Sequence, residues 1–362
     1  MATSLKSIRD DEEELLYEAD ESELPPSDIV AFNEQRSCAD LLRMYQSEQL
    51  IIQPDFQRDI VWPNPAQTRF IDSLVKELPI PSMCISFDYN TTERLVIDGL
   101  QRMSTIIKFL SDDTWKLSTV SDVDKRISGR TNDYIKKNHS SIYDRIQNLT
   151  IPVTVLRCDY KKESHMRYLF TIFHRLNTGG SKLSNQEIRN CIYSGSLNDL
   201  LKECVENKDY RHLLNLSAKG TYRFSHEELV LRFFAFTDKF SDYDGKLSSY
   251  LNDYMNHHRH ADSKFLRKKK KQFLEMIKIC YEKLTEGAAL PKGSKATTEA
   301  IMVGIGRNLS TLRSTRSATV QKRMKELLNT DEFHPDNLKN ALTSKDKMIS
   351  RLRSAVKVLG GK

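Results

Sequence analysis

Three short stretches of the chain combine polar side chains and glycines in a way that suits phosphate binding. The first, Asp98-Gly99-Leu100-Gln101-Arg102, lies between a β-type run and a helical pattern. Backbone N–H groups at a helix start are unpaired and partly positive, so they favour a phosphate. Gly99 would allow close approach, Arg102 could clamp phosphate oxygens, and Asp98 could hold Mg²⁺ or a hydroxyl group. The alternative is a common Asp-Gly turn followed by a solvated arginine.

The second stretch, residues 54–62, places Gln57 and Arg58 between two aromatic residues, Phe56 and Trp62. We expect both aromatic rings to pack in the core, which would give the two polar side chains a rigid frame. The alternative makes Arg58 a partner in an ordinary surface ion pair.

The third stretch is residues 173–180, in which Phe173 and Leu176 mark the inner face of a helix end. Arg175 and Asn177 lie near that end, and Gly179-Gly180 can present backbone amides to an anion. The alternative is a helix that ends at glycine without any ligand.

Hydrophobic periodicity predicts the elements that position these groups. We expect strands at 83–87, 94–98 and 150–158, and helices after Asn64-Pro65, after Gly99 and after the third strand. Ser184 and Glu187 form an S-x-x-E capping box for a further helix. Beyond Gly195 the patterns are helical, at 229–236, 265–284, 296–312, 320–328 and 345–356. The fold class is therefore α+β, with an all-helical C-terminal domain.

Composition excludes several classes of protein. The 362 residues, 39% hydrophobic and 29% charged, suffice for one large or two medium domains. No apolar run approaches the roughly 20 residues of a membrane helix, and the acidic N-terminus does not resemble a signal peptide, so we expect a cytoplasmic protein. The six cysteines include no C-x-x-C pair, which argues against thiolate zinc sites and a disulfide framework.

Charge is unevenly distributed along the chain. Residues 1–36 contain 3 basic and 11 acidic residues, whereas residues 261–362 contain 23 basic and 10 acidic ones. The first segment is typical of a disordered acidic tail. The second contains the run Arg267-Lys268-Lys269-Lys270-Lys271, which would attract the phosphates of DNA or form an ordinary solvated helix face.

Four segments together resemble the N-terminal domain of the GmrSD-type restriction endonucleases. They read PDFQRDIVW at 54–62, LPIPSMCI at 78–85, VIDGLQRMSTI at 96–106 and IFHRLNTGGSKLSNQEIR at 172–189. The resemblance covers about residues 37–195. It implies a fold similar to ParB and sulfiredoxin, and binding and hydrolysis of a nucleoside triphosphate coupled to recognition of modified or foreign DNA in anti-phage defence. Sulfiredoxin's catalytic cysteine motif is missing, so that chemistry is not implied.

The resemblance also has one departure at the first motif. Relatives commonly have Asp-Gly-Gln-Gln-Arg where this chain has Leu100 in place of the first glutamine. A leucine side chain forms no hydrogen bond, so hydrolysis could be slow or absent here while nucleotide binding persists.

These observations lead to one main hypothesis. Residues 1–36 form the tail, 37–195 the nucleotide-binding domain and 196–362 a basic helical domain. The protein would be an NTP-hydrolysing DNA sensor that acts with a separate effector protein. Asp98 would bind Mg²⁺ or activate water through it, Gln101 would position that water, and Arg102 would clamp phosphates. The remaining nucleotide contacts would come from Gln57, Arg58, Gly99, Arg175, Asn177, Gly179 and Gly180, and the DNA contacts from Arg267, Lys268, Lys269, Lys270 and Lys271.

Two other hypotheses remain open. The first is a metal-dependent DNA endonuclease, since related restriction enzymes carry an HNH-type nuclease domain. Its candidate segments, His257-His258-x-His260 and His334-Pro335-Asp336-Asn337, also fit a solvated helix end and the start of a helix. The second is a non-hydrolysing module in which the nucleotide is a conformational ligand. The oligomeric state is open as well, with a homo-oligomer among the options.

Overall fold

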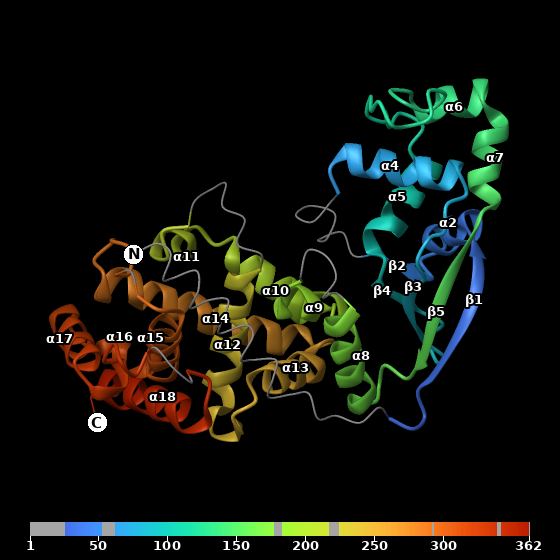
Figure 1. Cartoon of the computed structure of the whole chain (residues 1–362). Helices are drawn as coiled ribbons and strands as arrows, with labels where there is room; N and C mark the ends of the chain where they lie inside the picture. Colours follow the sequence, from blue (N-terminus) through green and yellow to red (C-terminus); the bar gives the residue numbers. More distant parts are fainter. Residues whose placement is uncertain are drawn as a thin grey trace. The chain divides into compact units, whose positions relative to one another are not determined.

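The computed structural model describes residues 26–52, 62–176, 183–216, 224–291, 293–338 and 342–361. They form two compact units, which divide between residues 182 and 183 (Figure 1). We expected the domain boundary at residue 195, after helix α9 (Asn185–Ile192). The two units divide before this helix, so α9 belongs to the second unit.

The N-terminal unit contains a mixed five-stranded sheet in the order β1-β5-β3-β4-β2. Strands β3 and β5 run parallel, as do β2 and β4, and the other neighbours are antiparallel. The three predicted strands are confirmed, and two others were not predicted. Their bounds are β1 (Val30–Ser37), β2 (Leu50–Ile51), β3 (Met83–Asp88), β4 (Arg94–Asp98) and β5 (Thr150–Cys158).

Strand β1 corrects the expected extent of the acidic tail. Residues 30–36, which we assigned to that tail, pair with β5 from Val30 opposite Arg157 to Ser37 opposite Thr150. The strand is mostly exposed, so its side chains show no buried alternation in the sequence. Backbone pairing with a strand about 120 residues away holds it in place, and local patterns cannot reveal such pairing. Residues 1–25 lie outside the described part of the chain.

Helices cover the sheet of the N-terminal unit. Ile85, Val96 and Val153 point to one face and join a single hydrophobic core with helices that pack on one another. These helices are α2 (Cys38–Gln46), α4 (Asn64–Val75), α5 (Leu100–Ser111) and α7 (Ser140–Asn148). Helix α8 (Glu163–Leu176) packs against β4, and α6 (Asn132–Asn138) packs beside α7. Pro65 in the first turn of α4 starts that helix as predicted.

The second unit contains helices and no strand among its described residues. The predicted capping box is present, since Ser184 and Glu187 each accept a hydrogen bond from the other residue's backbone. The pattern at 296–312 is interrupted at Asn308. After α9 the helices are α10 (Ser196–Val205), α11 (Lys208–Leu213), α12 (Ser225–Lys239), α13 (Leu247–His258), α14 (Ser263–Ile279) with a π-helical turn (Cys280–Leu284), α15 (Lys295–Arg307), α16 (Leu309–Ser314), α17 (Ser317–Leu328) and α18 (Lys345–Gly360).

None of the helices in the described ranges combines the length and the hydropathy needed to cross a membrane.

Candidate functional site

The first motif lies at the predicted strand-to-helix junction. Asp98 ends β4, and Gly99 precedes α5 with a left-handed backbone conformation, φ = 86°. A Cβ at this position would lie 2.5 Å from Met83 Cγ. Glycine is therefore required both by the turn and by the close approach of α5 to the start of β3.

Arg102 connects this junction to the second family motif. Its Nη2 donates to Asp98 Oδ2 at 2.9 Å and to the Ser82 carbonyl at 3.4 Å, and its Nη1 donates to the Pro81 carbonyl. The Arg102 side chain is 15% exposed and that of Asp98 33%. The guanidinium group, expected to clamp phosphate, thus holds the Pro81-Ser82 backbone against the start of α5.

Gln101 connects the junction to the motif at 54–62. Its Oε1 accepts a hydrogen bond from the Trp62 N–H at 2.8 Å, and Gln67 Nε2 donates to the Trp62 carbonyl at 2.8 Å. The Trp62 ring packs edge-on against Phe70, with ring centres 5.7 Å apart, and against the hydrophobic core, as predicted. Gln101 therefore anchors the last residue of that motif.

Leu100, which departs from the family pattern, packs against the core of the N-terminal unit. An apolar side chain at this position gains from burial. The structure thus gives Leu100 a packing role, and the expected loss of hydrolysis stays a prediction.

Two kinds of chemistry find little support at this junction. Burial, helped by the charge of Asp98, raises the pKa of the neighbouring Cys84 thiol to about 12, so Cys84 is not a ready nucleophile. No group of three or more His, Cys, Asp or Glu side chains that could hold a metal lies within the described ranges. Asp98 offers one carboxylate, already bonded to Arg102, which does not make a Mg²⁺ site without further ligands.

Several predicted nucleotide contacts lie outside the described residues, namely Gln57, Arg58, Asn177, Gly179 and Gly180. Arg175 is exposed near the end of α8. The structure brings together Asp98, Gly99, Gln101 and Arg102, and the convergence of the other residues on them stays a prediction.

The basic run on α14 does not face one way. Arg267, Lys268 and Lys271 are exposed, whereas Lys269 is 1% exposed and donates to Asp238. Burial lowers the pKa of Lys269, although Asp238 partly offsets this. Because its ammonium group is inside the unit, Lys269 is removed from the predicted DNA contacts. The partly exposed Lys270 pairs with Glu203.

Two of the histidine candidates for a nuclease, His258 and His334, differ in their surroundings. His258 stacks on Phe265, with ring centres 4.2 Å apart and planes 12° apart. Burial, with help from the charge of His257, lowers the pKa of His258 to about 4. His334 is largely exposed and lies 3.6 Å from an Asp336 carboxylate oxygen.

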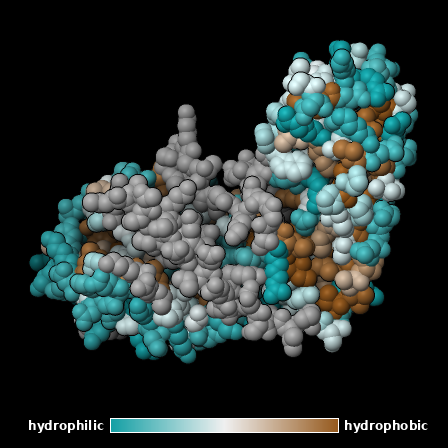
Figure 2. Space-filling view, viewed as in Figure 1, coloured by the Kyte–Doolittle hydropathy of each residue, from teal (hydrophilic) through white to brown (hydrophobic). Residues whose placement is uncertain are grey.

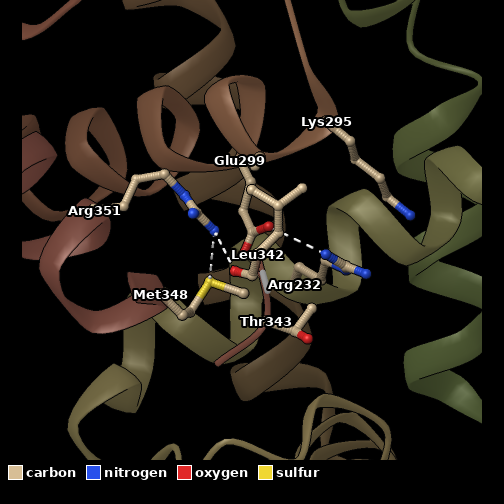
Figure 3. Close-up of a pocket in the computed structure, with 8 residues that line it drawn as sticks. Arg232, Lys295, Glu299, Leu342, Thr343, Met348 and Arg351 are labelled. Atoms are coloured by element: carbon tan, nitrogen blue, oxygen red, sulfur yellow. Dashed lines mark hydrogen bonds and ion pairs between the residues drawn. The ribbon is translucent and has the colours of Figure 1, made fainter. Parts of the chain in front are cut away.

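A buried charged cluster in the second unit was not predicted. Glu228 bonds Arg189, Arg232 and Lys295, and Arg232 also bonds Glu299. Part of the cluster lines a cavity of about 10 Å³ (Figure 3), which has room for about one water molecule and is too small for a nucleotide. The sequence contained one sign of this cluster. Glu228 and Arg232 are one helical turn apart, and Arg232 interrupts the otherwise apolar run 229–236.

Comparison with known proteins found a similarity to a domain of restriction-system proteins. Residues 38–194, which are 157 of the 362, match the family model described as GmrSD restriction endonuclease, N-terminal domain. The matched region includes all four of the motifs on which the resemblance was based. No curated protein and no solved structure showed significant similarity to the chain.

Proposed function

We propose that this protein is a nucleotide-binding, NTP-hydrolysing DNA sensor of a restriction-type anti-phage system, acting with a separate effector protein. The observation that supports it is the junction at Asp98–Arg102. There, Gln101 and Arg102 hydrogen-bond to two other family motifs, at Trp62 and at Pro81-Ser82. All of these residues lie within the region that matches the family. We also propose that its mixed sheet and helices form a ParB/sulfiredoxin-like fold.

Phosphoryl transfer depends mainly on positioning and on neutralising charge. In this proposal a triphosphate binds beside the start of α5, where the helix dipole favours an anion. A guanidinium group has five N–H donors, and Arg102 uses three in the hydrogen bonds described above. The other two could bind phosphate oxygens together with Arg58. Gln101 would orient water, and Arg175, Asn177, Gly179 and Gly180 would complete the pocket.

The helical unit would bind DNA without sequence specificity through the exposed side chains of Arg267, Lys268 and Lys271. Mg²⁺ would arrive with the triphosphate and bind Asp98, whose carboxylate lies at the Asp98–Arg102 junction.

The test compares binding and phosphate release for all four ribonucleoside triphosphates, with and without DNA, in the parent and in Arg102→Ala. We expect the variant to bind at least about tenfold more weakly, because an arginine–phosphate contact contributes on the order of 1.5–3 kcal/mol. Arg126→Ala is the matched control, since Arg126 forms an ion pair with Asp124 elsewhere in the unit. A folded Arg102→Ala that binds and hydrolyses nucleotide like the parent would refute the proposal.

Arg102→Lys tests whether the positive charge alone supports nucleotide binding. Lysine keeps the charge but cannot span the two carbonyls and Asp98 at once. Circular dichroism of each variant checks folding. Tight binding without phosphate release would favour the non-hydrolysing module, and cleavage of plasmid with Mg²⁺ or Mn²⁺ would favour the nuclease.

A further inference from the structure

Strand β1 forms one edge of the sheet and lacks three of the usual features that protect an edge, namely a short length, a proline and a bulge. It is eight residues long, contains no proline and pairs with β5 without a register shift. The opposite edge strand, β2, has two residues. Natural sheets protect edges with short strands, prolines, bulges or charges, because an open edge offers unpaired backbone groups to another strand.

The backbone pattern shows which residues of β1 face the open side. Cys38 N–H donates to the Leu149 carbonyl at 3.0 Å, in register with the β1–β5 ladder. Hydrogen-bonded positions alternate in an antiparallel pair, so the even-numbered residues of β1 bond β5. Ala31, Asn33 and Gln35 therefore direct their N–H and C=O groups outward, and no turn or loop backbone in the described ranges bonds them.

A side-chain contact supports this assignment. Thr154 Oγ1 donates to Asn33 Oδ1 at 2.9 Å, and these residues lie directly opposite each other. Opposite side chains come closest at positions that are not hydrogen-bonded to each other through the backbone. Asn33 is thus at a position whose backbone groups point away from β5.

The side chains of the edge are apolar at one end and neutral in charge overall. Val30 is 49% and Phe32 41% exposed, and apolar residues gather over the strands of this unit in Figure 2. Glu34 and Arg36, the two charged residues of β1, pair with each other at 2.7 Å. Two copies of this edge therefore do not repel each other.

We propose that β1 pairs antiparallel with the β1 of a second copy of this chain, forming a dimer with a continuous ten-stranded sheet. With the twofold axis at Asn33, Ala31 lies opposite the partner's Gln35, so that all three outward-facing residues form backbone hydrogen bonds. Glu34 then lies opposite the partner's Phe32 and Arg36 opposite the partner's Val30. No like charges are directly opposed, which a cross-strand pair requires. This self-complementarity favours a second copy over an unrelated strand.

The test measures the mass of the full-length chain in solution by light scattering over a range of concentrations. We expect a dimer, and we expect Asn33→Pro and Phe32→Glu to be monomers, because a glutamate at position 32 would lie opposite the partner's Glu34. Proline at position 33 removes an outward N–H that the β1–β5 ladder does not use. Tyr89→Glu is the control, because it makes the same type of change at a similarly exposed aromatic residue outside β1. A monomeric parent, or folded variants that remain dimeric, would overturn the proposal.

Hydrogen exchange gives a second measurement that needs no variant. The amides of Ala31, Asn33 and Gln35 should become protected as the concentration rises, while those of Phe32 and Glu34 are protected throughout. If the three outward amides exchange at the same rate at every concentration, the proposal fails. If they are protected in a monomer, a segment of the same chain covers the edge, and the proposal also fails.

Discussion

Single residues at the junction of β4 and α5 hold the N-terminal unit together in ways that their types do not reveal. A glutamine and an arginine after Asp-Gly suggest contacts to a ligand. The structure shows Gln101 bonded to Trp62 and Arg102 bonded to Pro81. Both residues thus connect segments distant in sequence, and a role in binding nucleotide would be additional to this one.

Gly99→Ala should destabilise the N-terminal unit. The left-handed backbone and the 2.5 Å approach of a Cβ to Met83 Cγ predict a loss of about 1–3 kcal/mol in the free energy of unfolding. Urea denaturation followed by circular dichroism measures this loss. Gly293→Ala is the control, since its Cβ would meet the nearest atom at 3.6 Å. Equal stability of Gly99→Ala and the parent would contradict the explanation.

At the scale of the element, the run of five cations on α14 contains one buried side chain, Lys269, among exposed and partly exposed ones. Phe265, Lys269 and Phe273 are spaced by four residues and therefore lie on one face of the helix. The Lys269 ammonium lies 5.6 Å from the Phe265 ring centre. Helical spacing in the sequence thus contained the signal that Lys269 faces inward, although the five consecutive charges obscured it.

Substitutions of buried and exposed lysines on α14 should therefore affect different properties, namely stability and DNA binding. Lys269→Ala removes a buried partner of Asp238 and should reduce the free energy of unfolding by about 1–3 kcal/mol. Lys268→Ala and Lys271→Ala should change it by less than about 0.5 kcal/mol. These two variants should instead weaken DNA binding and reduce its salt dependence. Urea denaturation and fluorescence anisotropy at several salt concentrations would measure the two effects, and the reverse pattern would exclude our interpretation of α14.

At the scale of the whole molecule, charge is segregated along the chain. Residues 1–24 contain 2 basic and 9 acidic residues, against the 23 basic and 10 acidic residues of 261–362. Because the acidic segment belongs to the same chain as the basic region, its local concentration near that region is high. The acidic segment should therefore compete with DNA.

Deleting residues 1–24 should strengthen DNA binding several-fold at low salt, and the gain should shrink as added salt screens the charges. Fluorescence anisotropy with one duplex DNA at several salt concentrations measures both effects. The matched control keeps the length and replaces the nine acidic residues by Asn and Gln. If the variant with this neutral segment binds DNA with the same affinity as the parent, electrostatic competition is excluded.

The sequence by itself determined the elements whose residues repeat with a clear period. Strands β3, β4 and β5, helix α4 and the capping box of α9 are present as predicted, because their burial patterns and caps are local. The four motifs also predicted the similarity to the GmrSD N-terminal domain model, which matches residues 38–194.

Tertiary structure decided what depends on partners distant along the chain. Strand β1 exists because β5 pairs with it, and Lys269 is buried because Asp238 of α12 meets it. Arg102 bonds Pro81 because the loop before β3 passes beside α5. In each case the contact that stabilises the residue joins segments about 20 or more positions apart. A local pattern can show that a residue such as Lys269 faces inward, but it does not identify the distant partner.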